Sequence, residues 1–281
     1  MRGFGRLRRL GARFRIQRKR DTEMLSAKYE RRAPHPQNAL DLIPGWTCAL
    51  PKKFGVTAGK IALHGDPRLI WALNQYGSLE GKRILELGPL EGAHSYLLEQ
   101  RRAAEILAIE ANKQAFLKCL VTKETLDLKR CRYLLGDFEK FLAETDHYYD
   151  IILASGVLYH MQNPVEVLDM ICRKCDALII WTHFFDPVLM PKDDPRRGPF
   201  SKKPTAFEYD GHTYTLFRRS YEHAWQANSY CGGPDDTHYW MLRPEIEALC
   251  RRNGFDDIRV EFENAEGING PSCMFFMRKT A

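Results

Sequence analysis

The stretch RILELGPLEG, from Arg83 to Gly92, decides the fold of this 281-residue chain. A short apolar run reaches the acidic Glu86, enters a glycine turn and leads into the helix-like sequence AHSYLLEQ. Strand, acidic residue, glycine turn and helix form the opening unit of a nucleotide-binding α/β sheet. Glycines let a ligand approach the backbone closely, and the helix directs its N-terminus at that ligand. The stretch therefore predicts a ligand site at the end of this strand.

Four further apolar runs follow at intervals that suit alternating strands and helices. One ends at Glu110, 24 residues beyond Glu86, which is the spacing of a carboxylate that binds ribose hydroxyls. The others end near Asp137, Ser155 and Trp181. Helices are expected over five ranges: Pro67–Tyr76 with Asp66 as its N-cap, Ala93–Gln100, Lys113–Thr125, Pro164–Cys175 and Pro244–Asn253. Such alternation predicts a parallel sheet with right-handed crossovers.

Together these elements resemble a class I S-adenosylmethionine (SAM)-dependent methyltransferase over roughly residues 60–281. The loop ASGVLYHMQNP, from Ala154 to Pro164, is particularly similar to that of the wobble-uridine tRNA carboxymethyltransferases and the related DUF1698-like methyltransferases. The resemblance implies a Rossmann-like α/β sheet that is mostly parallel, with its last strand antiparallel. One departure is Leu90, which replaces the middle glycine of the family's glycine-rich turn.

Phosphate-binding motifs do not fit this sequence. The turn reads E-L-G-P-L-E-G instead of the G-x-G-x-x-G of a dinucleotide-binding dehydrogenase, and no P-loop motif occurs. SAM carries no phosphate and needs neither. The resemblance assigns the cofactor site to residues at the strand ends: Glu86, Gly88, Gly92, Glu110, Asp137, Phe138, Ser155 and Tyr159.

In that assignment, Gly88 and Gly92 approach the amino-acid part of SAM and Glu110 binds the ribose hydroxyls. Asp137 accepts a hydrogen bond from the adenine amino group, and Phe138 packs on the adenine ring. Both acids could instead be ordinary solvated residues at strand ends.

Methyl transfer to an oxygen benefits from a general base, and histidine suits that role near neutral pH. His160 and His183 follow the fourth and fifth strands, whose ends lie close together in this family, so both are candidate catalytic residues. Each could alternatively be a structural histidine. No metal site is expected, because the lone CxxC of Cys172 and Cys175 has no accompanying ligand set.

About 60 residues separate the fifth strand from the next helix, and this insert, residues 182–242, is rich in aromatic side chains. It contains AFEYDGHTYTLF, two alternating runs joined by Asp210 and Gly211, which predicts a hairpin. Aromatic walls suit a small organic ligand, so the insert is expected to form the substrate side. Residues 21–60 are interpreted as a lead-in or lid, and residues 61–281 as the methyltransferase domain.

The positive charge of the chain is concentrated in a basic arm, residues 1–20, which holds nine Lys or Arg and no acid. The remaining 261 residues carry 33 basic and 36 acidic side chains, which argues for a small-molecule acceptor and against nucleic acid. The arm is either a solvated tail or a membrane-surface or partner contact. Eight dispersed cysteines and no apolar run of ~18 residues predict a cytoplasmic protein, peripheral to a membrane if the arm binds one.

We therefore expect transfer of a methyl group from SAM to a small organic acceptor, at oxygen. Two alternatives stay open at this point. One is alkylation of a tRNA base with SAM or carboxy-SAM, and the other is a non-catalytic binding protein with a degenerate cofactor site. The sequence carries no signal for an oligomeric state.

Overall fold

The computed structural model describes residues 28–227 and 230–280. The basic arm lies outside these residues. The chain divides into two compact units, Met1–Leu42 and Ile43–Ala281. In the first unit, helix α2 (Pro36–Asp41) begins after His35, whose Nδ1 accepts a hydrogen bond from the Gln37 N–H. None of the helices among the described residues is long and apolar enough to span a membrane.

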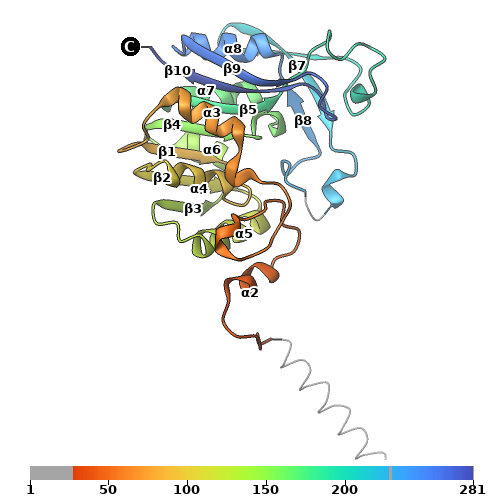
Figure 1. Cartoon of the computed structure of the whole chain (residues 1–281). Helices are drawn as coiled ribbons and strands as arrows, with labels where there is room; N and C mark the ends of the chain where they lie inside the picture. Colours follow the sequence, from red (N-terminus) through yellow and green to blue (C-terminus); the bar gives the residue numbers. More distant parts are fainter. Residues whose placement is uncertain (1–27, 228–229, 281) are drawn as a thin grey trace, which may run out of the picture. The chain divides into compact units, whose positions relative to one another are not determined.

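The second unit is built on a seven-stranded sheet with the order β3-β2-β1-β4-β5-β10-β9 (Figure 1). Its strands are β1 (Arg83–Leu87), β2 (Glu105–Glu110), β3 (Cys131–Leu135), β4 (Tyr149–Ser155), β5 (Cys175–His183), β9 (Asp257–Asn264) and β10 (Ser272–Arg278). The first five are parallel, and β10 runs antiparallel to both of its neighbours. The predicted Rossmann-like sheet with an antiparallel last strand is confirmed.

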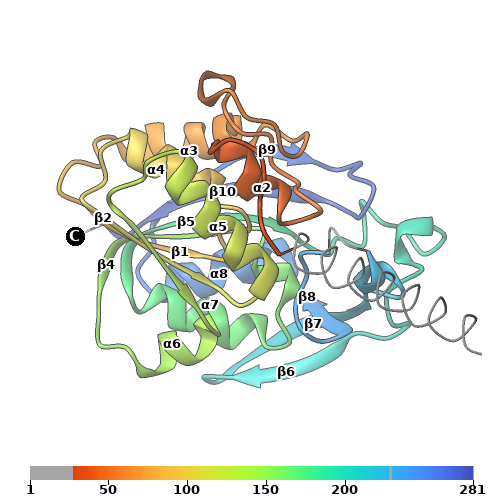
Figure 2. The same cartoon turned by 90° about the horizontal axis from the view of Figure 1, so that it is seen from below.

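Six helices cover this sheet, three on each face (Figure 2). One face carries α3 (Pro67–Tyr76), α4 (Ala93–Gln100) and α5 (Lys113–Thr125), and the other carries α6 (Phe138–Glu144), α7 (Pro164–Cys172) and α8 (Arg243–Arg252). The predicted bounds of α3, α4 and α5 are confirmed. Helix α7 ends three residues earlier than expected because Cys175 already belongs to β5. Helix α6 was not predicted.

The core lies around β4, β5 and β10, where apolar side chains are buried on both faces of the sheet. Residues 151–154, 177–180 and 273–277 are each at most 1% exposed. Strands covered by helices on both faces need such continuous apolar runs. The parallel strands β4 and β5, whose carboxyl ends lie at the same edge of the sheet, thus run through this buried core.

The insert after β5 forms a separate three-stranded antiparallel sheet of β6 (Thr205–Tyr209), β7 (His212–Ser220) and β8 (Thr237–Trp240). The predicted hairpin is confirmed. Asp210 and Gly211 have positive φ angles of 48° and 72°, as a two-residue type I′ turn requires. Within the described residues, the unit also contains five short 3₁₀ helices: η1 (Lys52–Phe54), η2 (Leu63–Gly65), η3 (Leu158–His160), η4 (Pro195–Arg197) and η5 (Ala224–Gln226).

Candidate active site

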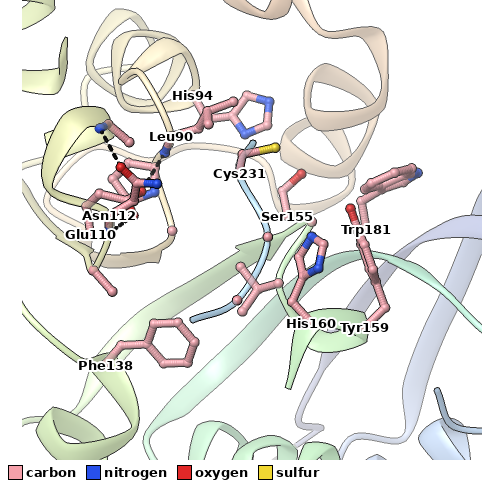
Figure 3. A pocket seen from close by; sticks show the side chains of 18 of the residues that line it. Leu90, His94, Glu110, Asn112, Phe138, Ser155, Tyr159, His160, Trp181 and Cys231 are labelled. Carbon is pink, nitrogen blue, oxygen red and sulfur yellow. Dashed lines mark hydrogen bonds between the residues drawn. The ribbon is translucent and has the colours of Figure 1, made fainter. Parts of the chain in front are cut away.

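A cavity of about 340 Å³ opens at the carboxyl ends of β1, β2 and β4, where open α/β sheets bind their ligands. Five of the predicted cofactor residues line it: Gly88, Glu110, Phe138, Ser155 and Tyr159. Glu110 and Asn112 lie at one end of the cavity, and Tyr159, His160 and Trp181 lie at the other (Figure 3). The strand ends thus bring together residues that are up to 93 positions apart in the sequence, from Gly88 to Trp181.

Glu110 holds the glycine turn in place while remaining at the cavity wall. Its carboxylate accepts hydrogen bonds from the Leu90 N–H at 3.0 Å and the Asn112 N–H at 2.8 Å. Burial raises its pKa, and these backbone donors oppose that rise. The Leu90 backbone has a positive φ of 56°, a conformation that a glycine adopts more easily. The bond to Glu110 fixes this conformation, which explains how leucine can replace the expected glycine.

Three predicted cofactor residues do not line the cavity. Glu86 is 2% exposed and accepts a hydrogen bond from the Ser95 hydroxyl. Gly92 has a φ of 79°, and a Cβ there would lie 2.5 Å from the Tyr133 hydroxyl oxygen. Asp137 is exposed at the start of α6, where its side chain caps the Glu139 N–H at 2.9 Å. Glu86 and Asp137 thus bind neighbouring groups of the protein, and Gly92 leaves room for Tyr133. The cofactor roles of all three stay predictions.

Arg68 and Trp181, to which the sequence assigned no role in the site, line the same cavity together with His94. Asp66, 2% exposed, caps α3 as predicted, but its carboxylate also binds the Arg68 guanidinium at 2.8 Å and His94 Nε2 at 3.0 Å. Although burial opposes it, these partners hold the pKa of Asp66 well below its usual range. The Arg68 guanidinium lies 4.5 Å from the centre of a Trp181 ring. The cavity wall here therefore combines an ion-paired guanidinium with an aromatic ring.

A buried ion pair holds residues 45–48 at this cavity. Glu91 and Lys118 lie 2.8 Å apart, with side chains 1% and 6% exposed. Glu91 accepts hydrogen bonds from the Thr47 N–H at 2.9 Å and the Cys48 N–H at 2.6 Å. Lys118 donates to the Gly45 carbonyl oxygen at 2.5 Å. Because Cys48 lines the cavity, the pair fixes one wall of the site. Residues 45–48 belong to the second compact unit, which begins at Ile43.

A second cavity of about 830 Å³ lies on the insert side and adjoins the first. The two share five lining residues: Tyr159, His160, Tyr230, Cys231 and Gly232. His160 and His183 both line this second cavity, so the structure brings the two candidate catalytic residues to one crevice. The Tyr159 ring lies between them, with its centre 4.0 Å from that of His160 and 4.8 Å from that of His183.

The surroundings of His183 fix which ring nitrogen carries the hydrogen. Its Nδ1 lies 3.1 Å from the Gly270 carbonyl oxygen and 3.0 Å from that of Pro271. Carbonyl oxygens only accept, so Nδ1 is the protonated nitrogen and Nε2 keeps its lone pair. The ring stacks on Trp240 at 4.9 Å, and burial lowers the pKa of His183 to about 4. The His183 ring is therefore neutral at neutral pH, with a fixed orientation.

His160 has a different partner. Its Nδ1 lies 2.5 Å from the Tyr221 hydroxyl oxygen, which itself accepts from the Gly233 N–H at 2.9 Å. In the arrangement in which the Tyr221 hydroxyl donates its hydrogen to Nδ1, the ring hydrogen of His160 is on Nε2. Burial, with the nearby His238 and His183, lowers the pKa of His160 to about 3. His160 is thus a neutral hydrogen-bond donor between the two cavities.

The comparisons with known proteins agree with this architecture. Residues 78–177 match a family model described as a methyltransferase domain. No curated protein matches the sequence. The solved N-terminal domain of EvdMO1, crystallised in the presence of S-adenosylhomocysteine and D-fucose, superposes with a TM-score of 0.65. Its identity is 22%, over 88% of this chain and 95% of that chain.

Two further solved structures share the fold at lower identity. A SAM-dependent methyltransferase from Mesorhizobium loti has a TM-score of 0.51 and 12% identity, over 78% of this chain and 100% of that one. Magnesium protoporphyrin IX methyltransferase from Synechocystis PCC 6803, with bound S-adenosylhomocysteine, has a TM-score of 0.50 and 13% identity, over 90% of each chain.

Residues 78–177 match a methyltransferase domain, and the strand order of the sheet is that of the class I methyltransferase fold, whose enzymes take SAM as their cofactor. The residues of the first cavity fit that cofactor. Gly88 leaves the backbone open, Glu110 offers acceptors for hydroxyls and Phe138 offers a ring face. The narrower resemblance to the wobble-uridine tRNA carboxymethyltransferases stays a prediction.

Proposed function

We propose that this enzyme methylates a hydroxyl oxygen of a small organic acceptor bound in the second cavity. The observation that carries the proposal is His183, a neutral histidine with an assigned tautomer, at the wall of a cavity that adjoins the cofactor cavity. SAM supplies an activated methyl group together with its own leaving group. The protein's part is to orient the acceptor and to take its proton.

In this proposal, Nε2 of His183 accepts the hydroxyl proton of the acceptor. The Gly270 and Pro271 carbonyl oxygens bond the opposite side of the ring at Nδ1. They hold its orientation and stabilise the positive charge that the ring gains. His160, through Nε2–H, donates a hydrogen bond that positions the acceptor between the two cavities. Tyr159 and Trp240 pack against His183 and limit the access of water.

The proposal is tested by incubating the enzyme with SAM and a library of hydroxylated metabolites, and following products that gain one methyl group by mass spectrometry. Formation of an O-methylated product by wild type supports it. Methyl transfer only to tRNA would favour the tRNA-base alternative. Bound S-adenosylhomocysteine with no turnover on any acceptor would favour a binding protein.

We also propose that Glu110 binds the ribose hydroxyls of the cofactor. Glu110→Ala should then weaken S-adenosylhomocysteine binding by about 1.5–3 kcal/mol, the contribution of hydrogen bonds to a charged acceptor. Isothermal titration calorimetry measures this loss. Glu110→Gln keeps an acceptor oxygen for one of the two N–H groups, that of Leu90 or that of Asn112, and should lose less. Wild-type affinity in the folded alanine variant would remove the assignment.

The pH dependence of turnover should report the lowered pKa of His183. Because that pKa is about 4, Nε2 stays unprotonated as the pH falls from 7 towards about 5, and turnover should persist. His160 and His183 both have depressed pKa values, so the folded state loses stability as the pH falls below 6.5. Rates are therefore normalised to the folded fraction, measured by fluorescence. A normalised rate that is halved at pH 6.5 would exclude His183 as the base.

A further inference from the structure

The second cavity contains a cation that has no anionic partner among the described residues. Arg219 lies on β7 and lines this cavity, and its Nε is buried without a hydrogen-bond partner. Its guanidinium carbon lies 5.6 Å from the Phe200 ring centre and 5.3 Å from that of Trp240. The attraction of these ring faces offsets only part of the cost of burying the cation, because a buried charge normally requires a counter-charge and hydrogen bonds.

The other charged groups around the cavity do not neutralise Arg219. Arg196 is already paired with Asp194 at 2.6 Å, and it donates to two backbone carbonyl oxygens. Glu222 lines the cavity and its charge attracts the guanidinium through space, but its side chain is exposed and forms no ion pair with Arg219 within the described residues. His183, whose pKa is about 4, is neutral at pH 7. The interior of the cavity is therefore cationic and bordered by aromatic rings.

Arg219 and His183 both contact the same indole. The His183 ring stacks on Trp240 at 4.9 Å, and the Arg219 guanidinium carbon lies 5.3 Å from that ring centre. The charge of Arg219 also lowers the pKa of His183, after the larger effect of burial. A ligand that contacts both side chains must carry its proton-donating group and its anionic group close together on one small scaffold.

We infer that Arg219 binds a carboxylate of the acceptor and that the acceptor class is a hydroxy acid. The inference rests on the proposed function in taking the second cavity as the acceptor site. A guanidinium binds a carboxylate through two parallel hydrogen bonds, which would give the enclosed charge its missing partner. The hydroxyl of the same molecule then reaches His183.

The test measures binding, so it does not depend on turnover. Probes are the three hydroxybenzoates and D-glucuronate, each paired with its uncharged methyl ester, titrated by calorimetry into enzyme saturated with S-adenosylhomocysteine. We expect at least one acid to bind wild type and its ester to bind about 10- to 100-fold more weakly. Arg219→Gln should weaken the acid by a similar factor and leave the ester unchanged, and Arg219→Lys should restore part of the affinity.

Arg218→Gln is the matched control, because Arg218 is the adjacent residue of β7 and is exposed. It should bind the acid like wild type. S-adenosylhomocysteine affinity reports that Arg219→Gln is folded, since the cofactor cavity does not include Arg219. Binding of no acid to wild type, equal binding of acid and ester, or equal loss in both arginine variants would overturn the inference. Methylation of neutral acceptors alone would overturn this inference but leave the proposed function intact. Binding of an acid that depends on Arg219, without methyl transfer, would contradict only the proposed function.

Discussion

His183→Ala is expected to lower kcat by about 10²- to 10⁴-fold while the affinity for S-adenosylhomocysteine stays close to that of wild type. The reason lies in the site geometry. The ring lines the acceptor-side cavity and is not part of the cofactor cavity, so its removal takes away the proton acceptor without disturbing the cofactor wall. A residual rate should survive, because orientation of the two substrates contributes to the rate independently of the base. Steady-state kinetics that quantifies the S-adenosylhomocysteine formed measures kcat. Isothermal titration calorimetry measures the affinity for S-adenosylhomocysteine.

His147→Ala is the matched control for this experiment. His147 is an exposed histidine that precedes β4, at the end of the strand opposite Ser155, and its loss should leave kcat unchanged. His183→Asn separates the base from the packing, since an amide can donate to the Gly270 and Pro271 carbonyl oxygens but cannot accept the proton. If His183→Asn turns over like wild type, the proton is taken elsewhere. Weaker cofactor binding with unchanged kcat would instead indicate that His183 contacts the cofactor and does not act as the base.

Local sequence patterns were sufficient to predict the sheet and most of its helices. Strands such as β4 and β5 are continuous apolar runs, and α5 has Asn112 as an N-cap whose side chain accepts from two backbone N–H groups. These signals need only neighbouring residues. Helix α6 was missed although its sequence carries the same kind of signal. Asp137 caps it, and Phe138, Phe141 and Leu142 recur at helical spacing. The resemblance assigned Asp137 to adenine binding, whereas its side chain caps α6 in the structure.

The candidate site was predictable only where a residue's role follows from its place on a strand. Glu110 and Ser155 reach the cavity because they end β2 and β4. Glu86, one position from the end of β1, points instead into the interior beneath α4 and binds Ser95. Successive side chains of a strand face opposite sides, so a shift of one residue decides between cavity and core.

Contacts between distant segments could not be predicted from the sequence. Arg219 and Trp240 meet only because β7 and β8 pair in the insert sheet. The assigned tautomer of His183 depends on carbonyl oxygens 87 and 88 positions away. No periodicity or spacing encodes such distances. The packing of the insert against β5 and the β10 side of the sheet creates the acceptor-side chemistry.

The ion pair of Glu91 and Lys118 is another contact between distant segments that the sequence does not predict. Its loss is expected to have the largest effect on stability. Their ion pair joins residues 27 positions apart, and Glu91 also binds backbone groups 43 and 44 positions away. Glu91→Ala removes the carboxylate but leaves the Lys118 ammonium, 6% exposed, without its counter-charge. It also leaves the Thr47 and Cys48 N–H groups without their acceptor.

We expect Glu91→Ala to lower the free energy of unfolding by about 3–5 kcal/mol, the usual cost of breaking a buried pair from one side. Urea denaturation followed by circular dichroism measures it. The double variant Glu91→Leu with Lys118→Met removes both charges and should be less destabilised than Glu91→Ala. Glu80→Ala is the control, because Glu80 pairs with Arg102 at a surface where the side chains are 65% and 70% exposed. Such a pair contributes about 0–1 kcal/mol.

Cofactor affinity gives this prediction a second, independent readout. Since Cys48 lines the cofactor cavity and its N–H is held by Glu91, loosening residues 45–48 should weaken S-adenosylhomocysteine binding in Glu91→Ala under conditions where the variant is folded. Glu80→Ala should bind like wild type. If Glu91→Ala unfolds at the wild-type urea midpoint and binds the cofactor normally, the ion pair does not hold residues 45–48 in place. If stability falls but affinity is unchanged, residues 45–48 support the fold without forming a working wall of the site.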